Sequence, residues 1–167
     1  MLGDILYFDE SYDEAQKIEL LYTIFKNDFI DNPTYLNQTI FIDPKSHDKT
    51  EDKEKIFWHI VTRKERGRRR FDNDRACRIK WIKPIILNYS HSKIKFFYYF
   101  EDNRKIRLYL WAYDEDFVVI LQKLGNSSSY LVTSFYIDND NKREKLQKKY
   151  EDYINKVDER LNNCEWF

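Results

Sequence analysis

Two short segments of this sequence carry side chains that together could cleave a phosphodiester without a metal ion. The first, residues 58–64, contains His59 and Arg63, and the second, residues 127–134, is rich in hydroxyl groups. Cleavage of RNA by its own 2′-hydroxyl needs a base for the hydroxyl proton, an acid for the leaving oxygen, and a cation or hydroxyl beside the charged phosphorane. The candidate catalytic residues are therefore His59, Arg63, Tyr130, Thr133 and Ser134.

The same residues also have a purely structural explanation. A single histidine beside a tryptophan is commonly a hydrogen-bonded, half-buried residue, and serines at the start of a strand commonly form turns. The other two histidines, His47 and His91, lie in polar surroundings and are expected at the surface. A catalytic role for His59 and Thr133 requires that the segments carrying them face a common cleft.

The formal net charge of zero hides an uneven distribution along the chain. Residues 1–62 contain 6 Lys and Arg against 13 Asp and Glu, whereas residues 63–83 contain 10 against 3. The planar guanidinium of arginine suits phosphate groups and base stacking, so this Arg-rich block is a candidate nucleic-acid-binding surface. Its candidate contacts are Lys64, Arg66, Arg68, Arg69, Arg70, Arg75 and Arg78. The alternative is a solvated face that the acidic N-terminal third neutralises.

Several well-known kinds of site have no signature in this sequence. There is no Gly-rich phosphate loop, no HExxH, no CxxC and no GxSxG. The histidines and the two cysteines, Cys77 and Cys164, are too scattered to form a local zinc motif. We therefore expect no metal and no cofactor, which leaves acid–base chemistry or binding alone.

The elements that must position these residues begin with helices. Apolar residues recur at spacings of three and four over residues 11–30, and Ser11 with Glu14 has the pattern of a capping box. A second helix is expected from Asp72 or Asn73 to about residue 89, with Pro84 kinking it or dividing it into two.

Strands and one closing helix account for the rest of the chain. Short β-branched runs predict strands at residues 39–42 and 56–62, on either side of an exposed polar loop at 45–55. Four further β-rich runs, separated by short polar breaks, predict an antiparallel meander at residues 94–100, 106–113, 117–123 and 130–137. Residues 141–163 return to a helical period. The predicted fold class is α+β, with N-terminal helices, a four-stranded antiparallel β-meander and a C-terminal helix.

Three segments together resemble the Barnase–EndoU–colicin E5/D–RelE group of metal-independent ribonucleases, in particular its phage-associated nuclease-like families. They are Phe57-Trp58-His59-Ile60-Val61-Thr62-Arg63, the helical stretch 74–86, and Tyr130-Leu131-Val132-Thr133-Ser134-Phe135-Tyr136. The resemblance implies His59 as general base or acid, Arg63 as phosphate ligand, and Thr133 with Tyr130 or Ser134 as stabilisers of the transition state. Where such families often have a second histidine, this chain has Arg63, Lys64 and Arg66, so the second proton-transfer group is not identified.

The length of 167 residues and the 42% hydrophobic content fit one domain with one core. We divide this single α+β domain, 1–167, into an acidic N-terminal helical part (1–50), a nuclease-like core (56–137) and the C-terminal helix (141–163). No apolar run approaches the roughly 18 residues of a membrane span, and the acidic N-terminus lacks the features of a signal peptide. We expect a cytoplasmic protein without membrane association.

The first functional hypothesis is an RNA endonuclease that cuts by 2′-hydroxyl attack, acting as a toxin or as a phage, mobile-element or defence-related effector. RNA is then the expected partner, with tRNA as one candidate. A neutralising protein is a second expected partner. The acidic N-terminal third could shield the basic block, or it could receive such a protein. The alternative is a non-catalytic nucleic-acid-binding or protein-interaction module that uses the block 63–83. A third hypothesis is a structural protein without a nucleic-acid role.

Overall fold

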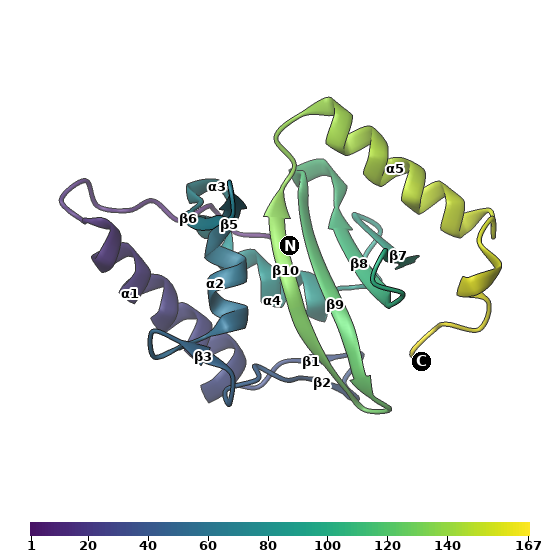
Figure 1. The fold of residues 1–167 in the computed structure, drawn as a ribbon, viewed down its shortest axis with the longest axis horizontal. Helices are drawn as coiled ribbons and strands as arrows, with labels where there is room; N and C mark the ends of the chain where they lie inside the picture. Colours follow the sequence, from purple (N-terminus) through teal and green to yellow (C-terminus); the bar gives the residue numbers. More distant parts are fainter.

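A curled six-stranded β-sheet organises the molecule (Figure 1). The computed structural model describes all residues, Met1–Phe167. The strands follow the order β1-β2-β10-β9-β8-β7 across the sheet. Their bounds are Tyr35–Leu36 for β1, Ile40–Ile42 for β2, Ile94–Phe100 for β7, Ile106–Ala112 for β8, Phe117–Gly125 for β9 and Ser128–Tyr136 for β10. Neighbouring strands are antiparallel except β2 and β10, which pair in parallel at the start of β10.

The predicted architecture, a four-stranded meander with N-terminal helices, is wrong. The strands β1 and β2 extend the sheet beyond β10, and two small hairpins stand apart from it. These hairpins are β3 (Lys49–Thr50) with β4 (Lys53–Glu54), and β5 (Thr62–Glu65) with β6 (Arg68–Phe71). Strands of two to four residues carry too few side chains to show a period of two. The pairing of β2 with β10 also joins segments that lie far apart in the sequence, which no local pattern reveals.

Helices cover both faces of the sheet. The α-helices are α1 (Glu14–Lys26), α2 (Lys55–Val61), α3 (Asn73–Ala76), α4 (Ile79–Leu87) and α5 (Asp140–Ile154). One turn of π-helix, η1 (Asn27–Asp31), continues α1, and the 3₁₀ turns are η2 (Tyr113–Glu115) and η3 (Glu159–Leu161). In Figure 1 α5 crosses one face of the sheet, while α1, α2 and α4 gather on the other side. None of these helices combines the length and the apolar character that a membrane crossing requires.

Alternating side chains of the central strands build two cores. In β8, Leu108 and Leu110 belong to the large core under α1, α2 and α4. Their neighbours Tyr109 and Trp111 belong to the smaller core under α5. Because the central strands are buried on both faces, they appear in the sequence as nearly continuous apolar runs rather than as a clean alternation.

The predicted strand at residues 56–62 is wrong, because the chain forms α2 there. Four residues of α2 are buried, and their spacing of i, i+1, i+4 and i+5 makes one stripe of a helix; they are Ile56, Phe57, Ile60 and Val61. The same short run of β-branched and aromatic residues also fits a strand, so its composition misled the prediction. His59 therefore lies in the last turn of a helix, and Thr62 begins β5.

Smaller differences affect the ends of the predicted helices. The capping box of α1 is formed by Asp13 and Gln16, which bond each other's backbone amides at 2.8 and 2.9 Å, and not by Ser11 and Glu14. The predicted helix after Asp72 is divided at residues 77–78, ahead of Pro84, which lies inside α4. The closing helix ends at residue 154 instead of 163.

The loop predicted at residues 45–55 contains the β3–β4 hairpin and is not wholly exposed. Glu54 at its end is fully buried, and its Oε1 accepts a hydrogen bond from the Tyr22 hydroxyl at 2.7 Å. This contact ties the hairpin to α1, so it positions the start of α2.

Candidate active site

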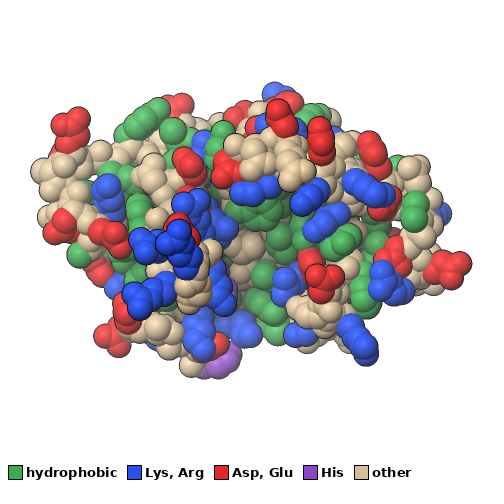
Figure 2. All heavy atoms as spheres, turned by 45° about the horizontal axis from the view of Figure 1, so that its top comes forward, with side chains coloured by type: hydrophobic (Ala, Val, Ile, Leu, Met, Phe, Trp, Pro, Cys, Tyr) green, Lys and Arg blue, Asp and Glu red, His purple; other side chains and the backbone are tan.

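A groove of about 740 Å³ opens between the end of α2, the β5–β6 hairpin and β10. Five cationic side chains, one carboxylate and one histidine line it. We call it the basic groove, and its lining residues are His59, Arg63, Lys64, Glu65, Arg69, Arg75, Val132, Thr133 and Lys142. Figure 2 shows Lys and Arg side chains gathered over the β5–β6 hairpin that forms one wall.

The β5–β6 hairpin holds like charges against one another. Its two-residue turn has positive φ at Arg66 (49°) and Gly67 (79°), as in the type I′ turns that suit tight hairpins. Arg63 then lies directly opposite Arg70, and Lys64 lies opposite Arg69. Like charges directly opposite in a strand pair are destabilising. A hairpin that retains two such pairs is suited to bind an anion that relieves the repulsion.

The acidic N-terminal third does not neutralise this hairpin. The carboxylate of Glu65, within the hairpin itself, lies 3.8 Å from Arg63 and 3.9 Å from Arg70. The ion pairs of the acidic residues before residue 55 go instead to lysines of the same region, Lys49, Lys53 and Lys55. Arg63 and Arg70 thus share one carboxylate, and the other cations of the hairpin form no ion pair, so the hairpin keeps an excess of positive charge.

The backbone of His59 is fixed by side chains from two other elements. Its carbonyl oxygen accepts hydrogen bonds from Thr133 Oγ1 at 2.9 Å and from Arg75 Nη1 at 3.3 Å. The carbonyl of Thr62, just beyond the helix, accepts from Arg75 at 3.0 Å and from Arg69 at 3.3 Å. The last carbonyls of a helix have no partners within it, so these contacts satisfy the end of α2 and hold it against β10 and β6.

The environment of the His59 imidazole favours its neutral form. Burial lowers its pKa from the ordinary 6.5, and the charges of Arg69 and Arg75 lower it further. A hydrogen bond with the backbone of Val132 acts in the opposite direction. A neutral imidazole has one unprotonated ring nitrogen, which can accept a proton. The lowered pKa of His59 therefore favours an imidazole that can act as a proton acceptor.

Arg75 serves both the fold and the groove. Its Nε lies 3.3 Å from Asp72, and Nη1 bonds the carbonyls at the end of α2 and Thr133 Oγ1. Burial lowers the pKa of its guanidinium, but an arginine keeps its charge in proteins. The bonds to the protein use Nη1 and Nε, so Nη2 remains for a ligand in the groove.

An irregularity in β10 aims two adjacent side chains at the same groove. The register with β9 shifts between Leu131 and Thr133, which leaves Val132 as an extra residue. In a regular strand neighbouring side chains point to opposite faces, and a bulge breaks this alternation. Val132 and Thr133 therefore both line the basic groove, while Leu131 and Ser134 are both buried.

The structure brings together half of the residues that the sequence singled out. His59, Arg63 and Thr133 line one groove, and three of the predicted basic contacts, Lys64, Arg69 and Arg75, line it with them. Arg66 and Arg68 are exposed on the hairpin outside the groove, and Arg70 lines a different one.

Three predicted site residues lie elsewhere for clear reasons. Ser134 is fully buried and its hydroxyl has no partner. Tyr130 packs against the large core, with Lys45 Nζ 4.4 Å from its ring centre. Arg78 stacks on Tyr136, with 3.9 Å between the guanidinium carbon and the ring centre, and donates to the Asp74 carbonyl. Arg78 therefore belongs to the packing of α4 against β10.

Sequence reasoning missed three lining residues, Glu65, Val132 and Lys142. Glu65 lies within the basic block and could have been identified from the sequence as the first carboxylate of that block. Val132 lines the groove because of the bulge in β10, and Lys142 lines it because of where α5 begins. No local sequence pattern indicates either position.

Comparisons with models of protein families, with curated proteins and with solved structures found no match to this chain. No group of three or more His, Cys, Asp or Glu side chains is placed to hold a metal ion. The geometry of the basic groove is therefore the starting point for its function.

Proposed function

We propose that this protein is a metal-independent endonuclease that binds RNA in the basic groove and cuts it by attack of the 2′-hydroxyl on the adjacent phosphate. The observation that carries the proposal is a single groove lined by His59, whose pKa lies below its ordinary value, together with Arg63, Arg75 and Thr133. A neutral base beside phosphate-binding cations is the set of groups that this reaction needs. The cytoplasm, where RNA is abundant, is the compartment we propose for it.

The RNA supplies the nucleophile, and the groove supplies proton transfer and charge stabilisation. His59 takes the proton of the 2′-hydroxyl as the 2′-oxygen bonds to phosphorus. The bond from phosphorus to the 5′-oxygen breaks, which leaves a 2′,3′-cyclic phosphate and a 5′-hydroxyl. The guanidinium groups of Arg63 and Arg75 stabilise the negative charge that builds on the non-bridging oxygens.

The leaving 5′-oxygen needs a proton, and we assign its delivery to Lys64. Lys64 lines the groove beside Arg63. A lysine ammonium can donate a proton to an alkoxide, whereas a guanidinium holds its protons too tightly. Lys64 thus takes the role of the second proton-transfer group, for which the sequence has no second histidine close to His59.

The test is incubation of RNA in EDTA with wild type, His59→Gln and His91→Gln. His91 is an exposed histidine outside the basic groove, so it is a matched control. We expect fragments with cyclic phosphate ends from wild type and His91→Gln only. His59→Gln should still bind 2′-O-methyl RNA, which cannot be cut. Equal cleavage by a folded His59→Gln variant would contradict the proposal.

A second candidate function is nucleic-acid binding without cleavage. The like-charge pairs of the β5–β6 hairpin favour it, because phosphate binding alone would offset their repulsion. Tight binding of RNA by wild type with no fragments at any pH between 5 and 8 would support this candidate.

A further inference from the structure

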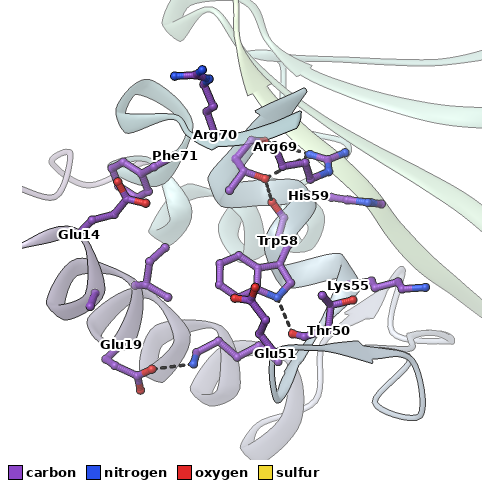
Figure 3. A pocket seen from close by; sticks show the side chains of 14 residues that line it. Glu14, Glu19, Thr50, Glu51, Lys55, Trp58, His59, Arg69, Arg70 and Phe71 are labelled. Atoms are coloured by element: carbon purple, nitrogen blue, oxygen red, sulfur yellow. Dashed lines mark hydrogen bonds and ion pairs between the residues drawn. The ribbon is translucent and has the colours of Figure 1, made fainter. Parts of the chain in front are cut away.

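A second groove, of about 1080 Å³, shares His59 and Arg69 with the basic groove. Its walls come from α1, the β3–β4 hairpin, α2 and β6, and Trp58 lies in the middle of it (Figure 3). We call it the tryptophan groove. Because two residues line both grooves, a ligand chain that occupies one can continue into the other.

Trp58 is a fixed aromatic surface in this groove. Its indole N–H donates to the Thr50 carbonyl at 2.8 Å, and its ring meets Phe57 edge to face at 5.3 Å. The other tryptophans of the chain are buried, whereas Trp58 is only partly covered. A ring that is anchored at its edge and lines an open groove is suited to stacking with a nucleobase.

The charges of the tryptophan groove divide it into two ends. Figure 3 shows Lys55, His59 and Arg69 pointing toward the sheet, while Glu14 and Glu19 lie on the far side of Trp58. Glu14 forms no ion pair with the protein, whereas Glu19 pairs with Lys53 at 2.6 Å. A phosphate is attracted to the cationic end and repelled from the acidic end.

The acidic end suits particular bases. Adenine, guanine and cytosine carry exocyclic amino groups with two N–H donors each, whereas uracil offers only its ring N3–H. The carboxylates of Glu14 and of Glu51, in the β3–β4 turn, are acceptors for such groups.

We propose that the tryptophan groove binds one base of a single-stranded RNA, stacked on Trp58, and that the phosphate of the same strand lies at His59. Bases with an amino group are preferred over uracil. This inference rests on the proposed RNA function and adds the substrate class. The substrate is single-stranded RNA, of which the protein recognises one base next to the cleaved bond.

The test uses short 2′-O-methyl RNA, which reports binding independently of cleavage. Trp58→Leu should weaken binding about 5- to 150-fold, the range typical of losing one stacked base. Tyr7→Leu, at an exposed tyrosine outside both grooves, is the control and should bind like wild type. Removing one base from the oligonucleotide should lower its affinity for wild type. The same change should lower the affinity for Trp58→Leu by less, because the abasic position and the substitution remove the same contact. Unchanged binding by a folded Trp58→Leu variant would overturn the inference.

Two further readouts keep the inference testable if Trp58→Leu fails to fold. Binding of the oligonucleotide should quench the tryptophan fluorescence of wild type, since Trp58 is the one tryptophan that is not buried. Trp58→Phe keeps a ring and should keep most of the affinity. Saturating binding without quenching would overturn the inference. Cleavage that depends on His59 but not on Trp58 would leave the proposed function standing and remove the base site alone.

Discussion

Thr133 Oγ1 donates a hydrogen bond of 2.9 Å to the carbonyl oxygen of His59, across 74 residues of sequence. The bond joins β10 to the end of α2, so the position of the candidate base depends on a strand near the other end of the chain. Arg75 bonds the same carbonyl more weakly, at 3.3 Å. The geometry of the basic groove therefore depends on contacts with the His59 backbone as well as on its side chain.

Replacing Thr133 by valine removes this bond and keeps the shape of the side chain. We expect Thr133→Val to lower the free energy of unfolding by about 0.5–1.5 kcal/mol, as for a typical hydrogen bond. Thr133→Ser, which keeps the hydroxyl, should lose less. Urea unfolding of the three proteins measures the difference. A valine variant as stable as wild type would show that the bonds from Arg75 and Arg69 are enough to hold the end of α2.

The lowered pKa of His59 predicts a stability that falls at acidic pH. The unfolded chain binds a proton at His59 with the ordinary pKa near 6.5, and the folded protein binds it only at lower pH. The contribution of His59 to folding is therefore complete above 6.5 and is lost as the pH falls below that value. One proton changes the free energy of unfolding by at most about 1.4 kcal/mol per pH unit.

The measurement is urea unfolding of wild type and His59→Gln between pH 8 and pH 5. The stability of wild type should decrease more over this range, and His91→Gln should follow wild type. Parallel curves for wild type and His59→Gln would mean that burial does not depress this pKa.

The salt dependence of RNA binding should identify the cations that contact phosphate. Arg63 lines the basic groove, whereas Arg68 is an exposed arginine of the same hairpin outside it. Arg63→Gln should reduce the slope of log affinity against log salt by about 0.7, the value for one phosphate contact on a single strand. Arg68→Gln should leave the slope unchanged. A reduced slope for Arg68→Gln with an unchanged slope for Arg63→Gln would place the RNA on the outer face of the hairpin instead.

Lys64→Arg separates the charge of Lys64 from its ability to give up a proton. The variant should bind RNA like wild type but cleave it at least about 100-fold more slowly, the lower range for a lost general acid. A substrate with sulfur in place of the leaving 5′-oxygen needs no proton and should restore the rate. The same substrate should not rescue His59→Gln. Normal cleavage of ordinary RNA by Lys64→Arg would assign the proton to another group.

Local sequence patterns were sufficient where an element is long and regular. The helical period within residues 11–30 and the β-rich runs from residue 94 correspond to α1 and to β7 through β10. The patterns failed where the chain changes conformation within a few residues, as at α2, a helix of only seven residues. They also could not show that β2 pairs with β10, because that contact depends on the whole fold.

Half of the residues that the sequence singled out line the candidate site, but the sequence could not show how they are assembled. Residue types alone indicated His59, Arg63 and Thr133, which the structure places along one groove. Ser134 was indistinguishable from Thr133 in the sequence, and only the bulge in β10 separates a groove residue from a buried one. Likewise, Arg75 bonds the carbonyls at the end of α2, whereas Arg78 bonds the Asp74 carbonyl and stacks on Tyr136.

The distance in sequence between His59 and Thr133 also sets the order in which the site is made. A ribosome releases the chain from its N-terminus at about 5–20 residues per second, and domains form as their parts become available. A nascent chain that ends before β10 already contains α2 and the arginine hairpin, but it lacks Val132, Thr133 and Lys142. Such a chain has one wall of the groove, and the bonds from Arg75 and Arg69 to the end of α2 lack the bond from Thr133. The complete site can therefore form only after β10 and the start of α5 have been synthesised.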